Sequence, residues 1–312
     1  MSTNSKSMNT KILSLQQKDN LAVIQFSTIP NNTLEIITST SALRNKYIEV
    51  KEISDGGSVN ELMVLNHSEK FVFLMDGDIL DGAKQNRVLN TSVLLAPQSK
   101  TKIPVSCVES GRWNYKTRNF QSTDYVAPVN LRANKSMKVA FNLGASMGHK
   151  SDQQEVWKDV SDYAALGSVR SATSNLSDVF DNSQNSYQKF LDSFTHHPEA
   201  NGVSFFVNKK PLVLDVFNRT DTMQEYFPKL IKGVALDVYG MKAEASEMTE
   251  AEASFKALDF MDSIETMERN THPGVALGTE NRFNNEAVSG FELSYQQQVV
   301  HLTALSLTNN KP

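Results

Sequence analysis

The densest cluster of polar residues in the chain is Asp76–Arg87, which lies between two apolar stretches. Lys84 and Arg87 suit phosphate, which arginine binds through a bidentate fork. Gln85 and Asn86 offer amide groups that can read a base or a sugar hydroxyl. The glycine pattern of a P-loop does not precede Lys84, so this is not a Walker-type site. A solvated loop with two turn glycines is the alternative interpretation of the same residues.

The same run holds three carboxylates, at Asp76, Asp78 and Asp81. Their oxygens suit a hard cation, so the cofactor stays open, with magnesium as the ion that they could bind. Asp76 and Asp78 are also candidates for the acid or base of a catalytic step. The single cysteine excludes a cysteine-based zinc site, and the six histidines include no His-x-His or His-x-x-x-His pair. We therefore predict no transition-metal centre.

A second polar cluster follows in Pro104–Trp113. Strand alternation places Cys107 and Glu109 on one face. Glu109 could act as a general base, bind a metal or pair with Arg112, and Trp113 could stack on a base or cover a cation. The alternative is a buried free cysteine, an exposed Glu–Arg pair and a core tryptophan. For Cys107 we favour the buried small hydrophobe, because no histidine base lies near it in the sequence.

Two ionisable residues lie inside apolar strands in the last third of the chain. His301 could face a pocket as an acid or base, or be a satisfied core histidine. Unpaired burial of the Asp215 carboxylate would be costly, so it points outward, pairs with a lysine or arginine, or helps to form a site. His301 thus joins Glu109, Asp76 and Asp78 as a candidate for catalysis.

Short stretches rich in β-branched and aromatic residues dominate residues 13–125. Turn signals separate them at regular spacing, which indicates an antiparallel sandwich or a partly open barrel. The predicted strands are Leu21–Phe26, Leu34–Ile37 and Tyr47–Ile53, followed by two hairpins, Glu61–Asn66 with Lys70–Met75 and Arg87–Leu95 with Thr101–Val108.

Residues 151–306 carry helix and hairpin patterns. A helix is predicted over Asn175–Phe194, and Val126–Lys150 is predicted to be a long ordered loop or a flexible crossover. Capping-box patterns mark three further helix starts, at Ser151 with Gln154, Asp221 with Gln224, and Thr249 with Glu252. The predicted hairpins are Gly202–Val207 with Leu212–Phe217, and Gly290–Tyr295 with Val299–Leu305.

A chain of 312 residues, 39% of them hydrophobic and 21% charged, is long enough to bury a substantial core. We predict an α+β fold with one domain over residues 13–306. Its N-terminal half, an antiparallel β-rich sandwich or barrel-like part over 13–125, packs on a helical and hairpin-containing part over 151–306. Residues 1–12 are expected to be a disordered lead-in, and residues 307–312 a tail.

The composition also indicates where in the cell the protein is expected and which partners it is expected to have. No apolar run reaches the roughly 20 residues that a membrane span needs. The polar N-terminus has no signal-peptide pattern, and a single cysteine fits a cytoplasmic protein. The formal net charge of -4 argues against nucleic acid as a partner.

Several motifs resemble the ADP-ribosylglycohydrolase- and rhodanese-phosphatase-associated domain family. The most specific are Lys84-Gln85-Asn86-Arg87 and the stretch from Ser106 to Trp113; Gln153–Trp157, Pro211–Phe217 and the strand around His301 also fit. The resemblance covers roughly Leu13 to Ser306. The family is named for its neighbours, and that neighbourhood implies NAD-derived nucleotides or ADP-ribosylation, in bacterial defence or nucleotide salvage. Asp78 stands where we expect glutamate to be common.

The resemblance and the clusters together lead to a working hypothesis. The protein is expected to bind an ADP-ribose- or NAD-derived nucleotide, and whether it hydrolyses that nucleotide stays open. Lys84, Arg87 and Arg112 would hold phosphates, Trp113 would stack on a ring, and Glu109 or an aspartate of 76–81 would be the acid, base or metal ligand. The alternative is a non-catalytic module that senses a small molecule or docks onto a partner enzyme.

Overall fold

The computed structural model describes residues 10–28, 34–54, 56–239, 241–242, 244 and 247–307. Mostly antiparallel strands and helices follow one another in separate runs along these residues, which confirms the predicted α+β class. The first strand already begins at Lys11, within the expected lead-in. The rest of that lead-in, residues 1–9, and residues 308–312 of the expected tail lie outside the described residues. No helix of the described part is long and apolar enough to cross a membrane.

One part of the fold is an antiparallel sheet of eight strands that draws on both ends of the chain. Its edge is the hairpin of the first two strands, and the second of these pairs with a strand that begins at Gly202. The two parts of the fold are therefore not successive halves of the sequence. In order, the strands are β1 (Lys11–Lys18), β2 (Leu21–Ser27), β12 (Gly202–Val207), β13 (Lys210–Phe217), β17 (Gln298–Ser306), β16 (Val288–Tyr295), β15 (Thr279–Asn284) and β14 (Asn270–Pro273).

The other part contains a six-stranded and a three-stranded sheet. The six-stranded sheet curls into a half-barrel, and its two edge strands contact each other. Its order is β11 (Phe120–Val126), β7 (Asp78–Gly82), β8 (Arg87–Leu89), β10 (Ser99–Cys107), β5 (Glu61–Asn66) and β4 (Ile48–Glu52). The three-stranded sheet is β3 (Ile36–Thr38), β6 (Phe71–Leu74) and β9 (Val93–Leu95).

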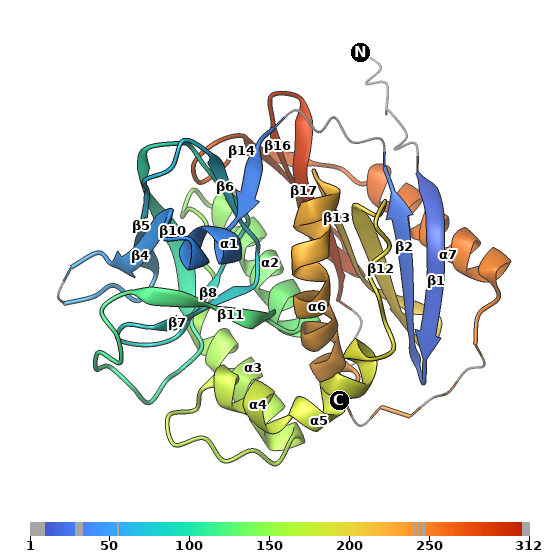
Figure 1. Ribbon diagram of the computed structural model, residues 1–312, viewed down its shortest axis with the longest axis horizontal. Helices are drawn as coiled ribbons and strands as arrows, with labels where there is room; N and C mark the ends of the chain where they lie inside the picture. The colour runs from blue at the N-terminus through green and yellow to red at the C-terminus, as the bar shows by residue number, and fades with distance from the viewer. Residues whose placement is uncertain are drawn as a thin grey trace.

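Helices fill the space between the two parts and cover the outer face of the large sheet (Figure 1). Asp215 of β13 faces the inner helices, whereas its neighbours Leu214 and Val216 pack with Phe260 on the outer side. Because successive side chains of a strand point to opposite faces of the sheet, each face of the large sheet packs against its own set of helices. The helices are α1 (Ser39–Arg44), α2 (Val129–Gly144), α3 (Gln153–Leu166), α4 (Leu176–Asn182), α5 (Gln184–Leu191), α6 (Thr220–Asp237) and α7 (Glu250–Glu265); α2 and α6 lie on the inner face and α7 on the outer face.

The two hairpins predicted within residues 61–108 are wrong in part. β5 pairs with β4 and β10, and β6 pairs with β3 and β9, so they do not form a hairpin with each other. β6 is almost entirely buried, which is typical of a strand covered on both faces, whereas burial alternates along β5. The predicted strand 87–95 is divided between two sheets, and only β8 pairs with β10.

Val126–Lys150 is not the predicted loop, because most of it is helix α2. The buried side of this helix includes Arg132, Lys135 and Ser136 beside its apolar residues. A helix is recognised in sequence by apolar residues at helical spacing, and here charged and polar residues occupy some of those positions. The prediction of one helix over 175–194 is also corrected, since it breaks at Ser183 into α4 and α5.

The side chain of Arg132 connects three elements in the interior. Its guanidinium donates to Asp215 of β13 at 2.8 and 3.2 Å and to Asp76 at 3.2 Å, and it reaches Thr303 of β17 at 3.1 Å. Lys135, one turn along the same helix, lies 3.2 Å from the second oxygen of Asp76. All four charged side chains are at most 1% exposed. Of the three alternatives that the sequence left open for Asp215, the structure shows the pairing with a basic residue.

His301 belongs to the same buried network. Its Nδ1 lies 2.9 Å from the Ser92 hydroxyl, and its Nε2 lies 3.3 Å from Asp215 Oδ1. The order of Ser92, His301 and Asp215 is that of a hydrolytic triad, but all three residues have 0% exposure. The Ser92 hydroxyl also accepts from the backbone N–H of Asp76. His301 is thus fully buried, with Nδ1 against Ser92 and Nε2 within ion-pair distance of Asp215.

Removing Arg132 should destabilise the fold strongly. In Arg132→Ala, Asp76 and Asp215 stay buried without their shared partner, so the free energy of unfolding should fall by about 3–5 kcal/mol. Urea unfolding followed by circular dichroism measures this. The matched control is Lys138→Ala on the same helix, which removes a surface pair with Glu155 and should change stability by less than about 1 kcal/mol. Similar effects of the two substitutions would contradict the role given to Arg132.

Two buried carboxylates should make the protein lose stability in acid. Burial opposes ionisation of Glu280, but Arg282 and His149 outweigh it and lower its pKa to about 2. Burial likewise opposes ionisation of Asp215, and Arg132 and His301 hold its pKa well below the usual value. The unfolded chain therefore binds more protons, so stability should decrease as the pH falls from about 4 toward 2. Urea midpoints measured across this range test it, and a smaller decrease is expected in Glu280→Gln.

Candidate functional site

The two polar clusters found in the sequence meet where β8 pairs with the end of β10. Cys107 lies opposite Arg87 in this register. Beyond it, the backbone N–H of Val108 donates to the carbonyl of Asn86 at 3.0 Å, and the N–H of Asn86 donates to the Glu109 carboxylate at 3.1 Å. The turn at 83–86 and the segment at 107–113 are therefore one structural unit.

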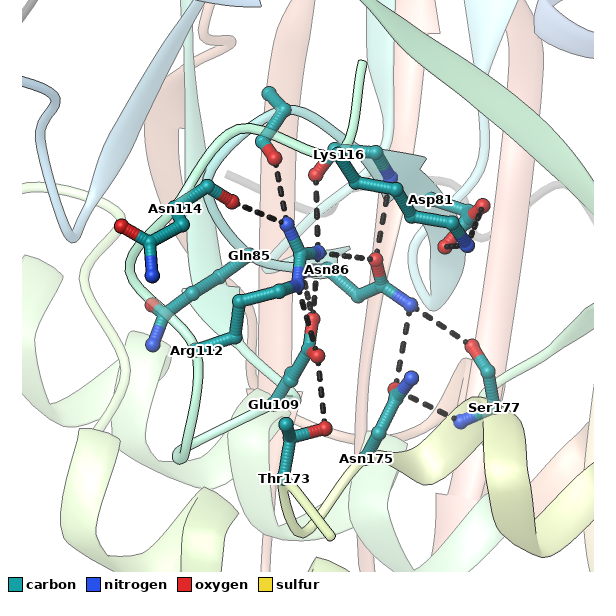
Figure 2. Close-up of polar contacts among 12 residues, drawn as sticks. Asp81, Gln85, Asn86, Glu109, Arg112, Asn114, Lys116, Thr173, Asn175 and Ser177 are labelled. Atoms are coloured by element: carbon teal, nitrogen blue, oxygen red, sulfur yellow. Dashed lines mark hydrogen bonds and ion pairs between the residues drawn. The ribbon is translucent and has the colours of Figure 1, made fainter. Parts of the chain in front are cut away.

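Arg112 is the centre of this unit (Figure 2). Its guanidinium forms a bidentate pair with Glu109, at 2.9 Å from Nε to Oε1 and 2.6 Å from Nη2 to Oε2. Its remaining donors reach the carbonyls of Ala83 and Asn114, at 2.6 and 2.8 Å, and the side-chain oxygen of Asn86, at 3.2 Å. All three guanidinium nitrogens thus donate to oxygens of the protein. The arrangement fixes the loop and leaves Arg112 few donors for a ligand.

Glu109 is held ionised by its partners. Burial opposes its ionisation, but hydrogen bonds from Arg112, Thr173 and the Asn86 backbone outweigh burial and lower the pKa of Glu109. Its two oxygens accept four hydrogen bonds in total, two of them from Arg112. A carboxylate of this kind is a weak base, so its observed role is to anchor the loop.

A segment that precedes α4 closes the unit from the other side. Gly111 donates its N–H to the carbonyl of Thr173 at 2.8 Å. A Cβ on Gly111 would lie 2.7 Å from the Thr173 Cα, so only glycine allows this approach. Asn175 and Ser177 accept hydrogen bonds from the side-chain amide of Asn86, at 3.2 and 3.0 Å. The glycine of the predicted motif therefore has a packing role.

Arg87 is fully buried behind this loop. It donates to the side chain of Gln85 at 2.9 Å and to the Cys107 sulfur at 2.8 Å, and its Nη2 lies 3.6 Å from Oε1 of Glu52. Burial raises the pKa of the Cys107 thiol to about 11. The cysteine is a buried, unreactive thiol, as we favoured from the sequence.

Lys84 has a different environment from the other charged residues of the cluster. Its ammonium lies 5.4 Å from the ring centre of Trp113 and 5.2 Å from that of Tyr115. Lys84 is 9% exposed, whereas Trp113 and Tyr115 are 41% and 50% exposed. In the described part of the chain, no carboxylate lies within ion-pair distance of this ammonium. A partly desolvated cation therefore lies under two aromatic rings that solvent can reach.

A cleft of about 840 Å³ opens beside these rings, between the end of β4 and the loop that leads into β11. Tyr115 lines it together with Glu52. Three basic residues, Lys51, Lys116 and Arg118, also line it, and so does Glu49, which pairs with Lys51 at 3.4 Å. The cleft lies beside the end of β4 and the segment 115–119 that precedes β11. It combines an aromatic ring, positive charge and one buried carboxylate.

A second cleft, of about 650 Å³, lies where α1, β11 and α6 meet. Its charged groups are largely paired with one another. Lys229 bonds to Asp78 at 3.3 Å, Lys232 pairs with Asp124, and Glu225 accepts from hydroxyl groups beside α1. This cleft has fewer groups that require a ligand than the first one.

The predicted catalytic residues do not converge on one site. Asp76 and His301 lie in the buried network of Arg132. Asp78 accepts from the hydroxyls of Tyr226 and Ser39 and pairs with Lys229. Of the four candidate catalytic residues, Glu109 is the one that contacts residues 84–87, through the backbone N–H of Asn86. Among the described residues, no three His, Cys, Asp or Glu side chains are grouped so as to hold a metal ion.

None of the residues that line the first cleft was a candidate from the sequence; Glu52 and Tyr115 are two of them. A signal for Glu52 was present, because Ile48 and Val50 alternate with it on the inward face of β4. A charged residue at such a position requires a partner or a function. Tyr115 lies two residues beyond Trp113 and therefore outside the motif that runs from Ser106 to Trp113.

The fold and the site define an α+β protein of mostly antiparallel sheets with a cationic, aromatic cleft. The model of the ARG and Rhodanese-Phosphatase-superfamily-associated Protein domain matches residues 9–305, and the chain belongs to that family. The resemblance found from the motifs is thus confirmed. No curated protein and no solved structure shows a significant match to the chain.

Removing the anchor of the loop should loosen it. Glu109→Ala leaves the largely buried guanidinium of Arg112 without its ion pair, so the free energy of unfolding should fall by about 2–4 kcal/mol. Amide hydrogen exchange of residues 83–86 and 109–114 should accelerate most. Lys116→Ala is the control, because it breaks an exposed pair with Asp81 and should change stability by less than about 1 kcal/mol. Unchanged exchange in Glu109→Ala would refute the anchoring role.

Proposed function

We propose that the protein binds an ADP-ribose- or NAD-derived nucleotide in the cleft beside Tyr115. The observation that carries this proposal is the Lys84 ammonium, buried under two exposed aromatic rings and without a carboxylate partner in the described residues. Lys84 does not itself line the cleft but lies beside Tyr115, which does, so its ammonium gains from an anion held next to that ring. The rings beside it offer the flat surface on which a nucleobase stacks.

The rim of the cleft supports the same ligand class. Lys51, Lys116 and Arg118 line it. Lys51 and Lys116 form exposed pairs with Glu49 and Asp81, whereas Arg118 has no ion-pair partner among the residues that the structure describes. Several cations around an open cleft suit a diphosphate, whose charge is spread over several oxygens. Net charge gave no such indication, because it carries no information on how charge is distributed.

The residues of the two sequence motifs take different parts in this proposal. Lys84 holds phosphate and Trp113 stacks on a ring, as expected from the sequence. Arg112, Asn86 and Gln85 fix the loop that carries them, since their polar groups already bond to the protein. The Arg87 guanidinium carbon lies 5.6 Å from the ring centre of Trp113, so Arg87 contacts the tryptophan and adds positive charge to the site.

The alternative is a non-catalytic sensor or a module that docks onto a partner enzyme. Two observations favour it. The carboxylates expected to act as acid or base are neutralised by arginine or lysine, which supports binding more than turnover. The name of the family associates the domain with ARG and rhodanese-phosphatase proteins, which fits a role beside an enzyme.

Nucleotide binding should raise the melting temperature. A ligand at about 100 times its Kd stabilises the native state by about 2.7 kcal/mol. We expect a shift with ADP-ribose or NAD that is lost in Lys84→Met and in Trp113→Ala. Lys256→Met and Phe255→Ala on α7 are the matched controls, because they change the same residue types on the far side of the large sheet.

The outcomes separate the two functions. A shift that the control variants keep and the cleft variants lose supports the nucleotide site, and chromatography of the incubated ligand then tells binding from hydrolysis. If no nucleotide shifts the wild-type melting temperature, with or without magnesium, the docking alternative replaces the nucleotide proposal.

A further inference from the structure

We infer that residues 113–115 form a lid over Lys84, and that this lid opens to let an anion reach the ammonium group. The inference rests on the proposed function, because it concerns how the phosphate of a nucleotide gains access to Lys84. It also makes a claim of its own, namely that the segment opens in the free protein, which can be tested without a ligand.

The two rings of this segment cover Lys84. The ammonium lies 5.4 Å from the ring centre of Trp113 and 5.2 Å from that of Tyr115, and Lys84 is 9% exposed. Tyr115 lines the cleft of about 840 Å³, whereas Lys84 does not. An anion in the cleft therefore meets the tyrosine ring first, and direct contact with the ammonium requires the segment to move aside.

The segment itself is held by few contacts. Trp113, Asn114 and Tyr115 are all exposed and belong to no helix or strand. Within the described part of the chain, their backbone N–H groups donate no hydrogen bond, and of their carbonyls that of Asn114 alone accepts one, from Arg112 at 2.8 Å (Figure 2). A segment whose backbone is exposed and largely unbonded opens at a low free energy compared with the rest of a fold.

Firm contacts on either side limit the movement to these three residues. Before the segment, Arg112 forms its bidentate pair with Glu109. After it, the backbone N–H of Lys116 donates to the carbonyl of Ala83 at 2.9 Å. The lid therefore lies between two fixed points, and it can open without unfolding the loop unit.

Lys84 belongs to the fixed part of the site. The preceding residue, Ala83, has a φ of +37°, which is uncommon for a residue with a Cβ. Its N–H donates to the Thr117 hydroxyl at 3.2 Å, and its carbonyl accepts from Arg112 at 2.6 Å. A strained backbone persists only where the surrounding contacts determine it. We therefore assign the movement to residues 113–115.

A nucleotide compensates for the contacts that opening removes. Moving the lid separates the ammonium from two aromatic rings, which attract a cation. A phosphate oxygen replaces these contacts with a charge-assisted hydrogen bond, and a ring that returns over the ligand can stack on its base. The open lid is thus a minor state of the free protein, and the nucleotide shifts the population toward a lid closed on the ligand.

Lysine acetylation measures how often Lys84 becomes accessible. The full chain is treated with sulfo-N-hydroxysuccinimide acetate, and mass spectrometry follows each lysine. Asn114→Gly gives the lid backbone more freedom, so the rate at Lys84 should rise roughly 2- to 5-fold. Asn60→Gly, in an exposed turn outside the lid, is the matched control and should leave that rate unchanged. Lys229, whose side chain is 4% exposed and paired, is the internal reference and should react equally slowly in all three proteins.

The outcomes separate the lid from the nucleotide site. Equal rates at Lys84 in Asn114→Gly and in the wild type overturn the lid. Saturating ADP-ribose should slow the acetylation of Lys84 by about 10-fold or more, because the bound ligand blocks access. Protection by ADP-ribose without an effect of Asn114→Gly overturns the lid and leaves the nucleotide site standing. A faster rate in Asn114→Gly without protection supports the lid and overturns the nucleotide site.

Discussion

The burial of the Arg132 guanidinium is the constraint on which the rest of the structure depends. A charge in the interior is tolerated only with close, opposite partners, and here they come from distant parts of the chain: Asp76 before β7 and Asp215 in the middle of β13. The pairing fixes helix α2 against the large sheet and, through Asp76, against the half-barrel. The loop that carries Lys84 begins a few residues beyond this point. The position of the site is therefore linked to the ion network between the two parts of the fold.

Within the site, charged groups whose hydrogen-bonding capacity the protein uses fully lie close to a charged group that has no ion-pair partner in the described residues. Arg112 and Glu109 use their hydrogen-bonding capacity on the loop itself, which orders the segment that carries Trp113. Lys84 keeps a charge that no carboxylate of the described residues pairs with. A binding site requires both kinds of residue, because rigid supports hold the free groups in place for a ligand. This division separates positioning residues from recognition residues more clearly than the motifs do.

The family name gives the same cleft a biological setting. Association with ARG and rhodanese-phosphatase proteins makes ADP-ribose chemistry a reasonable context, and the exposed rings beside a buried cation fit a nucleotide. Function on a given fold resides in the site, and this site has the features of recognition more than those of proton transfer. The proposed nucleotide receptor beside an enzyme would account for the geometry and for the association in the family name.

The sequence by itself determined the class of the fold, the local elements with regular patterns and the residues that form the loop unit. The hairpins β12–β13 and β16–β17 and the Thr249 cap of α7 follow from alternation and capping, which are local properties. Only the tertiary structure decided which charges meet. Helix α2 was hidden because polar residues occupy part of its buried face. The partners of Asp76, Asp78 and His301 could not be read locally either, because Arg132 lies 56 residues from Asp76, Tyr226 lies 148 residues from Asp78 and Ser92 lies 209 residues from His301. The spacing of apolar residues along the sequence indicates which positions are buried, but it does not indicate whether a buried charged side chain faces a partner or a cleft.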